Sequence, residues 1–414
     1  MRPETAAPHT PRHRPLTVGE RIEMRRRLHR MPRRLLAEMV GRSEEWLRLI
    51  ETGRLRLDSV EMILRLAEVL QIPDFRDLIE LPVRETGHHT DPAGQLIEAL
   101  EPIVLAHPVT AADSAAGPSA DRRNHHWLAD EVADCAAIWA DSPRRYSQLA
   151  LRLPHLLAAG RCWNQRLGTG SAELSLPRAY HLTREVLTQL GAHHLAAIAA
   201  DRARLLARTI GHPHLLAAGG WHWASALLQM GEDRHAHTFA LATARRDLPD
   251  DGTLDTDVVR GALELLAAEA AARTDLAEAA RLLAAAQVRA RRVGDDRRIL
   301  GIGFGTCEVE LTRMEIALSR RDIQQVMDSA ATVHRLDMLP IGRRTRYFII
   351  LATAYTLQGD IAAATLALGR AAESSPEDLR FDGDVHAILR TLLRHQNQLV
   401  RDKITHLVNV AGIA

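Results

Sequence analysis

The sequence has few cysteines, few aromatic residues and almost no lysine. Its three cysteines, Cys135, Cys162 and Cys307, are odd in number and widely spaced, which argues against a disulfide framework and against zinc-finger spacing. Aromatic residues make up 4 % of the 414 residues while alanine and leucine are frequent, and this favours an all-α fold. Lys403 is the only lysine, so arginine carries nearly all of the positive charge.

The chain also lacks the patterns of membrane proteins and of enzymes. It has neither a secretory signal nor a run of 18 apolar residues, so we expect a cytoplasmic protein without a membrane partner. We find no nucleophile elbow, no paired carboxylates beside a base and no cofactor fingerprint. We therefore expect no catalytic residues, no enzymatic activity and no cofactor. The length suits two or more domains.

The stretch 17–57 predicts three short helices separated by tight breaks. Thr17 and Glu20 have the spacing of a capping box, which satisfies backbone N–H groups at the start of a helix. We expect this helix to end near Arg30. Pro32 then stands at a helix start, where the missing N–H of proline has no cost.

The second and third helices of this stretch are separated by a turn that contains Gly41. The second helix covers 33–40, and Ser43 is placed to cap the third, which ends at Gly53. Two short helices joined by such a turn are the unit that places its second helix in the DNA major groove. The apolar residues at helical spacing in the third helix are Trp46, Leu47 and Ile50.

Charge in this region agrees with binding to nucleic acid. From Arg12 to Leu57 there are 13 arginines and 6 glutamates, a net charge of +7, in a chain whose net charge is +1. A local basic excess is typical of a surface that binds phosphates. The alternative is a basic helix surface that faces only solvent.

The segment LLAEMVGRSEEWLRLIETGR resembles the Xre/Cro-type helix-turn-helix of phage-repressor-like regulators, in the form found in large actinobacterial regulators. The resemblance implies double-stranded DNA as a partner. It also implies a five-helix domain over 16–82, in which Asp58 and Glu61 cap a fourth helix and DFRDLIEL forms a fifth. Ile63, Leu66, Ala67 and Leu70 would close a core over Leu36, Val40 and Leu47. The matching positions are Ala37, Gly41, Leu47, Ile50, Glu51 and Gly53.

The same resemblance places base-reading side chains at the start of the third helix. There, glutamate can accept a hydrogen bond from a cytosine amino group, and leucine can pack on a thymine methyl group. Acidic residues in a first helical turn are, however, also favoured by the helix dipole without any DNA. The base-facing candidates are Ser43, Glu44, Glu45 and Leu49, and the candidate phosphate contacts are Arg33, Arg42, Arg48 and Arg54.

Outside this domain, composition divides the rest of the chain into three parts. Residues 1–15 hold four prolines and predict a disordered start. Residues 83–126 read as a linker that contains one short helix, GQLIEALEPIVLA. From 127 to 414 we expect helices joined in pairs.

The helical pairs of 127–414 are predicted by their turns. Taking five turns as equivalent gives intervals of 40, 43, 47 and 38 residues, which indicates a repeat of helical hairpins. This region is similar to a tetratricopeptide-like array, an α-solenoid, and the order of domains again resembles the actinobacterial regulators. That layout implies a homodimer with a peptide, small-molecule or protein effector on the array. The turns lie at Gly191, Gly231, Thr274, Arg321 and Gly359, and Asp275, Asp322 and Asp360 are placed to cap second helices.

Three further features of the array have a functional and a structural interpretation. Trp221, Trp223 and Arg202 could line an effector groove, or the tryptophans could be core residues and the arginine a surface residue. The adjacent and i+2 histidine pairs do not have metal-ligand spacing, so we expect no metal site. The Gly-rich segment 301–307 reads as a loop or a loose helix start, because no strand is predicted before it and no phosphate-binding motif follows.

Together these patterns predict a DNA-binding transcriptional regulator whose array dimerises and senses an effector. The alternative is a protein-interaction adaptor built on the array, with a degenerate DNA-binding domain. The acidic and apolar residues at Glu44, Glu45 and Leu49 favour that alternative.

Overall fold

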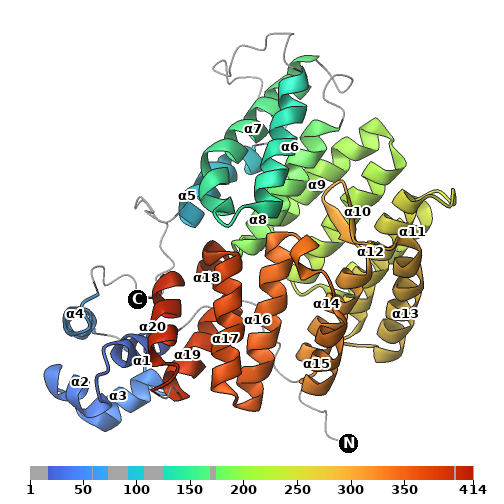
Figure 1. The fold of residues 1–414 in the computed structure, drawn as a ribbon. Helices are drawn as coiled ribbons and strands as arrows, with labels where there is room; N and C mark the ends of the chain where they lie inside the picture. The colour runs from blue at the N-terminus through green and yellow to red at the C-terminus, as the bar shows by residue number, and fades with distance from the viewer. Residues whose placement is uncertain are drawn as a thin grey trace, which may run out of the picture. The chain divides into compact units, whose positions relative to one another are not determined.

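The computed structural model describes residues 17–57, 59–72, 92–106, 125–167, 174–395 and 398–413. Over these ranges the chain is all-helical, as the composition predicts, apart from one two-stranded hairpin (Figure 1). Within the described part, no helix is long and apolar enough to cross a lipid bilayer. The predicted disordered start, the fifth helix of the DNA-binding domain and most of the predicted linker lie outside the described residues.

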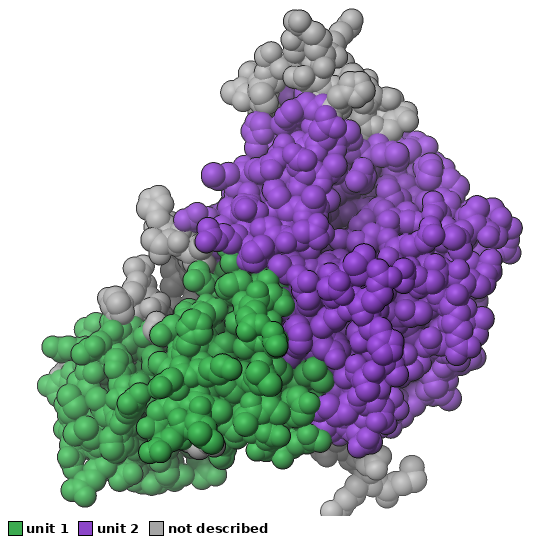
Figure 2. Space-filling model, in the orientation of Figure 1, with its two compact units in different colours: residues 1–88, 351–414 green, residues 89–350 purple. Residues whose placement is uncertain are grey.

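The elements form two compact units, shown in different colours in Figure 2. Unit 1 contains residues 1–88 together with 351–414, and unit 2 contains residues 89–350. The division falls inside helix α16 (Ile341–Gln358), so one helix carries the chain from unit 2 into unit 1. No pattern in the sequence indicated that residues 351–414 would group with the N-terminal helices.

In unit 1, four N-terminal helices and four C-terminal helices are described. Helix α1 contacts both α3 and α19, and α17 to α20 contact one another. The N-terminal helices are α1 (Val18–Leu28), α2 (Arg33–Met39), α3 (Glu44–Glu51) and α4 (Val60–Val69). The C-terminal helices are α17 (Ile361–Ser374), α18 (Pro376–Phe381), α19 (Gly383–His395) and α20 (Arg401–Val410).

The starts of α1 and α3 are confirmed, and the start of α4 corrects the prediction. Both hydrogen bonds of the Thr17–Glu20 capping box are present, and the Ser43 hydroxyl accepts from the Trp46 backbone N–H at 3.1 Å. Helix α4 is capped by Ser59, whose hydroxyl accepts from the Met62 N–H at 3.3 Å. Ser59 directly precedes the first helical residue, and Asp58, which we predicted to cap this helix, lies outside the described residues.

The core of α1 to α4 contains the residues that the apolar spacing predicts. Leu36, Val40 and Leu47 are buried, and residues of α4 close over them. Trp46 is half-buried against this core, so it is a packing residue. The α4 residues in the cluster include Met62, Leu66, Ala67 and Leu70, and Ile63 is also buried.

In unit 2, helices that alternate along the chain pack against one another. Helices α6, α8, α10, α12 and α14 contact each other in that order, and each of α8, α10, α12 and α14 also contacts the helix that follows it. The helices are α5 (Pro92–Leu105), α6 (His125–Asp141), α7 (Arg145–Leu167), α8 (Ser175–Gln189), α9 (His193–Ile210) and α10 (Pro213–Gln229). They continue with α11 (Asp233–Arg246), α12 (Leu254–Ala271), α13 (Leu276–Val293), α14 (Thr306–Ser319), α15 (Ile323–Thr332), the 3₁₀ turn η4 (Leu336–Met338) and α16.

All five predicted turns join two consecutive helices, from α8/α9 to α16/α17. Gly191 and Gly231 adopt φ angles of 76° and 83°, a left-handed conformation that glycine reaches at no steric cost. The predicted caps are confirmed, because the carboxylates of Asp275, Asp322 and Asp360 each accept a backbone N–H at the start of a second helix. Much of the core between these helices is alanine, which lets neighbouring helices approach closely.

The Gly-rich segment 301–307 corrects a second prediction. It is preceded by strand β1 (Arg297–Ile299), which pairs antiparallel with β2 (Ile302–Phe304) inside the segment. Ile302 and Phe304 are fully buried, and both strands contact α12. Strands of three residues have no recognisable pattern of their own, and here burial against α12 stabilises them.

Candidate nucleic-acid interface

Helix α3 has one face packed in the core of unit 1 and one face open to solvent. Leu47, Ile50 and Glu51 are buried. The predicted DNA contacts around α3 lie on the other side, and this is the arrangement that an amphipathic helix with these apolar positions dictates. Arg42, Ser43, Glu44, Glu45 and Arg54 are exposed, and Arg48 and Leu49 are half-buried.

Glu51 joins the first three helices through ion pairs. Its carboxylate accepts from the Arg26 Nε at 2.6 Å and Nη2 at 3.0 Å, and from the Arg33 Nε at 2.9 Å. Glu51 is 1 % exposed and Arg26 6 % exposed, so removal of either charge would leave the other buried without its partner. Arg33, a predicted phosphate contact, is thus held at least in part by the protein itself.

Helices α1 and α3 approach so closely that Gly19 has no room for a side chain. A Cβ atom at Gly19 would lie 1.9 Å from the backbone oxygen of Ile50. Because this neighbour is a backbone atom in the last turn of α3, it cannot turn away as a side chain can. The contact, together with the Arg26–Glu51 pair, couples the position of α3 to that of α1.

On the outer face of α3, Arg48 is paired within its own helix. Its Nε and Nη2 donate to the two carboxylate oxygens of Glu45 at 2.7 and 2.5 Å. The hydrogen bond from Arg48 lowers the pKa of Glu45, so this carboxylate stays ionised. Exposed pairs of this kind are weak, and Arg48 can exchange Glu45 for a phosphate at little cost. Beside it, the Arg42 guanidinium lies 5.7 Å from the ring centre of Trp46.

An adjoining side of α1 carries two glutamates that bind arginines of α19. Arg390 donates to Glu20 at 2.5 Å and to Glu23 at 3.0 and 3.2 Å. Arg394 donates through Nε to Glu23 at 2.7 Å and through Nη2 to the other oxygen of the same carboxylate. Burial alone would raise the pKa of Glu23, but Arg394 and Arg390 outweigh it and lower the pKa to about 2. The sequence pattern does not indicate these ion pairs, because more than 360 positions separate the partners.

The three predicted effector residues make separate contacts in unit 2. The Trp221 indole N–H donates to the backbone oxygen of Ala262 at 3.2 Å, and its ring packs against the core that includes α12. Trp223 packs against a small cluster that contains Ala197 and Ala200. These contacts agree with the core interpretation of the two tryptophans, and Arg202 is half-buried on α9.

Between α8 and α10 lies a buried polar cluster that the sequence analysis missed. The Arg184 guanidinium donates to the His222 Nδ1 at 3.1 and 2.7 Å and to the Ser225 hydroxyl at 3.2 Å. The His222 ring stacks on His181, with 3.9 Å between ring centres. Burial is the main cause that lowers the pKa of His181 to about 3, and it also lowers the pKa of His222. Both rings are therefore neutral at pH 7.

This pair predicts a loss of stability in mild acid. A histidine whose pKa is depressed on folding stabilises the protein fully above its unfolded pKa of 6.5, and this contribution falls as pH drops below that value. We expect the free energy of unfolding to decrease between pH 6.5 and pH 5, above the range where most carboxylates titrate. Chemical denaturation across this range measures it. In His181→Phe/His222→Phe the slope should flatten, and an unchanged slope would contradict the assignment.

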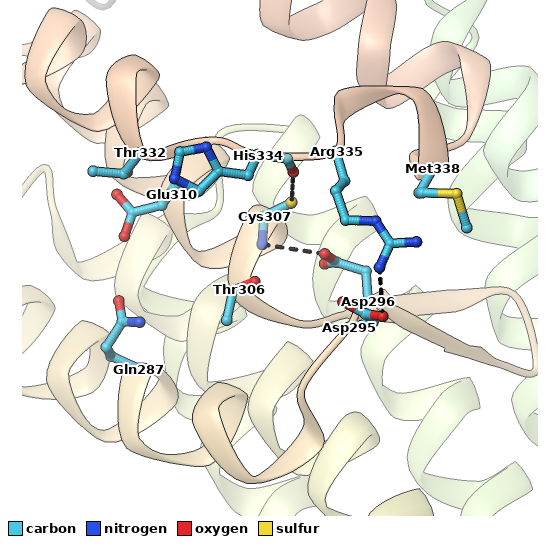
Figure 3. Close-up of a pocket in the computed structure, with 10 residues that line it drawn as sticks. All are labelled: Gln287, Asp295, Asp296, Thr306, Cys307, Glu310, Thr332, His334, Arg335 and Met338. Atoms are coloured by element: carbon cyan, nitrogen blue, oxygen red, sulfur yellow. Dashed lines mark hydrogen bonds and ion pairs between the residues drawn. The ribbon is translucent and has the colours of Figure 1, made fainter.

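One cavity, of about 290 Å³, lies between α13, α14 and the segment after α15 (Figure 3). Its polar groups are engaged in stabilising the protein. Asp296 accepts the backbone N–H groups of Cys307 and Glu308, Arg335 donates to Asp295 at 2.8 Å, and the Cys307 thiol donates to a backbone oxygen. Burial raises the pKa of Cys307 to about 12, so the thiol stays protonated and is a poor nucleophile. We find no catalytic arrangement in this cavity.

No cluster of three or more potential metal-binding side chains occurs in the part of the chain that the structure describes. No protein-family model, curated protein or solved structure matches the chain.

Proposed function

We propose that the protein is a sequence-specific DNA-binding transcriptional regulator. In this proposal α2 and α3 are an Xre-type helix-turn-helix, and the stacked hairpins of unit 2 are a tetratricopeptide-like solenoid that dimerises and binds an effector. The observation that carries the proposal is the two-sided α3. Its inner face is fixed to α1 and α2 by Glu51, while its outer face presents Arg42, Arg48 and Arg54 to solvent.

This geometry suits entry into a major groove. A recognition helix contacts base edges with residues of its N-terminal part while flanking cations bind phosphates. Helix α3 begins at Glu44 with its N-terminal turn exposed, and arginines lie on both sides of it in the sequence. In a homodimer, two such helices about 34 Å apart would match half-sites one helical turn apart.

One observation favours the alternative of an adaptor without DNA binding. Two of the four candidate phosphate contacts are already paired in the protein, Arg33 with Glu51 and Arg48 with Glu45. An adaptor would use the solenoid to bind protein segments. The regulator and the adaptor differ in one property: only the regulator needs these arginines for DNA binding.

The test is a selection of fragmented genomic DNA on the full-length protein at two salt concentrations, followed by sequencing. A regulator should enrich a motif of paired half-sites that survives the higher salt, because base contacts persist when phosphate attraction is screened. Featureless enrichment that disappears with salt, for protein tested with and without cell extract as a source of effector, would overturn the proposal and favour the adaptor.

The exposed arginines around α3 should set the salt dependence of DNA binding. Replacing Arg42, Arg48 and Arg54 with glutamine should reduce affinity for all sequences and lower the salt slope by about one for each lost phosphate contact. Titrations of DNA at several salt concentrations measure this. The matched control is Arg281→Gln, which removes an exposed arginine that pairs with Glu278 in unit 2. Equal slopes for the triple variant and the control would contradict the assigned interface.

A further inference from the structure

Helix α1 has two functional faces, and each is bound to a different part of unit 1. Gly19, Ile22 and Arg26 face the core and α3, through the close contact with Ile50 and the pair with Glu51. Glu20 and Glu23, three residues apart and therefore on one side of the helix, face α19. A movement of α19 is consequently passed to α3 through a single helix.

The contact between α1 and α19 is made by partly buried charges with complementary spacing. Arg390 and Arg394 are four residues apart, so both guanidiniums reach the Glu23 carboxylate from one face of α19. Glu23 is 3 % exposed, and Arg390 also binds Glu20. Glu23 also accepts from Arg27 of its own helix at 3.2 Å, and separation of α19 would remove its other two arginine partners.

This docking leaves the outer face of α3 uncovered. Arg42, Glu44, Glu45 and Arg54 are exposed in the same structure in which Glu23 is buried beneath the two arginines. Docking also places the positive charges of Arg390 and Arg394 on Glu20 and Glu23. This neutralises negative charge on a domain that would bind DNA. Both features favour DNA binding by the docked form.

We propose that α19 is an intramolecular latch, closed by Arg390 and Arg394 on Glu20 and Glu23, that fixes the orientation of the DNA-binding helices for simultaneous engagement of two half-sites. The inference rests on the proposed function. Fixing the orientation of the DNA-binding helices raises the effective concentration of the second domain at its half-site. The latch therefore acts on binding to paired half-sites and leaves binding to one half-site unchanged.

The experiment compares full-length wild type with Arg390→Gln/Arg394→Gln, with the control Arg370→Gln and with the charge-swapped protein Glu20→Arg/Glu23→Arg/Arg390→Glu/Arg394→Glu. Arg370 is an exposed arginine of α17 that pairs with Glu373. Two quantities are measured: amide hydrogen exchange of α1 and α19 without DNA, and the ratio of affinities for DNA with two half-sites and with one.

In Arg390→Gln/Arg394→Gln, hydrogen exchange of the α1 amides should accelerate roughly a hundredfold, as expected for loss of a buried ion pair. The affinity ratio should fall at least tenfold, with single half-site affinity unchanged. The control should match wild type, and the charge swap should recover part of both losses. Exchange equal to that of the control would overturn the latch. Faster exchange with an unchanged ratio would overturn its role in orientation.

The design separates failure of the latch from failure of the proposed function. If wild type binds no DNA specifically, the proposed function fails together with the orientation role of the latch. Hydrogen exchange then still decides whether α19 docks on α1. If wild type binds paired half-sites, the affinity ratio decides the role of the latch without further assumption.

Discussion

Replacing Glu51 with alanine should destabilise the N-terminal helices by about 3–5 kcal/mol, because it leaves a buried guanidinium without its counter-charge. Glu51 is 1 % exposed and is bound by Arg26 and Arg33, so one substitution releases the ties of α3 to both α1 and α2. We expect DNA binding to be lost with it, although Glu51 does not lie on the outer face of α3.

Hydrogen exchange of α1 to α3 in the full-length protein measures this loss directly, because it reports local opening without requiring unit 2 to unfold. The control is Glu38→Ala, which removes an exposed glutamate that pairs with Arg34 on α2. This variant should leave the exchange rates unchanged. Similar protection in the two variants would mean that Glu51 is not the tie between the helices.

Replacing Phe304 with alanine should destabilise unit 2 by about 3–5 kcal/mol, as for other fully buried phenylalanines. Phe304 is 0 % exposed and packs on Gly261 of α12, where a Cβ atom would lie 2.1 Å from the phenyl ring. Gly261→Ala should therefore also be destabilising, by about 1–3 kcal/mol, because it overfills the same space.

The double variant Phe304→Ala/Gly261→Ala tests whether these two effects share one site. The new methyl group would enter the space that the ring vacates, so the combined loss should be smaller than the sum of the single losses by at least about 1 kcal/mol. Chemical denaturation of the wild type, the two single variants and the double variant gives the coupling free energy between the two sites. The control is Gly369→Ala in α17, where no atom lies within 4 Å of the added Cβ. Additive losses would show that the hairpin moves away from α12 when the ring is removed.

Most helix starts and turns could be predicted from the sequence, because their causes lie within a few residues. Thr17, Ser43, Asp275, Asp322 and Asp360 each satisfy a backbone N–H three residues ahead, and this spacing is visible in a linear sequence. The apolar spacing of α2 to α4 likewise predicted which side chains form the core. At α4 the cap is Ser59, one residue after the predicted Asp58. Aspartate and serine can both cap a helix, so the spacing alone did not distinguish them.

The residues of the candidate interface are exposed, as the helical spacing predicts, but the ion pairs that some of them form were not predicted. The sequence placed Arg42, Glu44, Glu45 and Arg54 around the third helix, and the structure exposes all four. It did not indicate that Glu51 would hold Arg33, since that pairing depends on how α2 crosses α3. The resemblance marked Glu51 as a matching position, and the structure supplies its physical role.

Only the tertiary structure decided which distant segments meet. The pairs between Glu23 and Arg390, the stacking of His181 on His222 and the hairpin packed on α12 each join residues from different elements. No local spacing encodes such contacts, because burial and charge pairing depend on the packing of whole helices. The sequence by itself therefore determined where several helices begin and which faces of α2 to α4 are apolar. The packing of those faces decided that the C-terminal helices belong with the N-terminal ones.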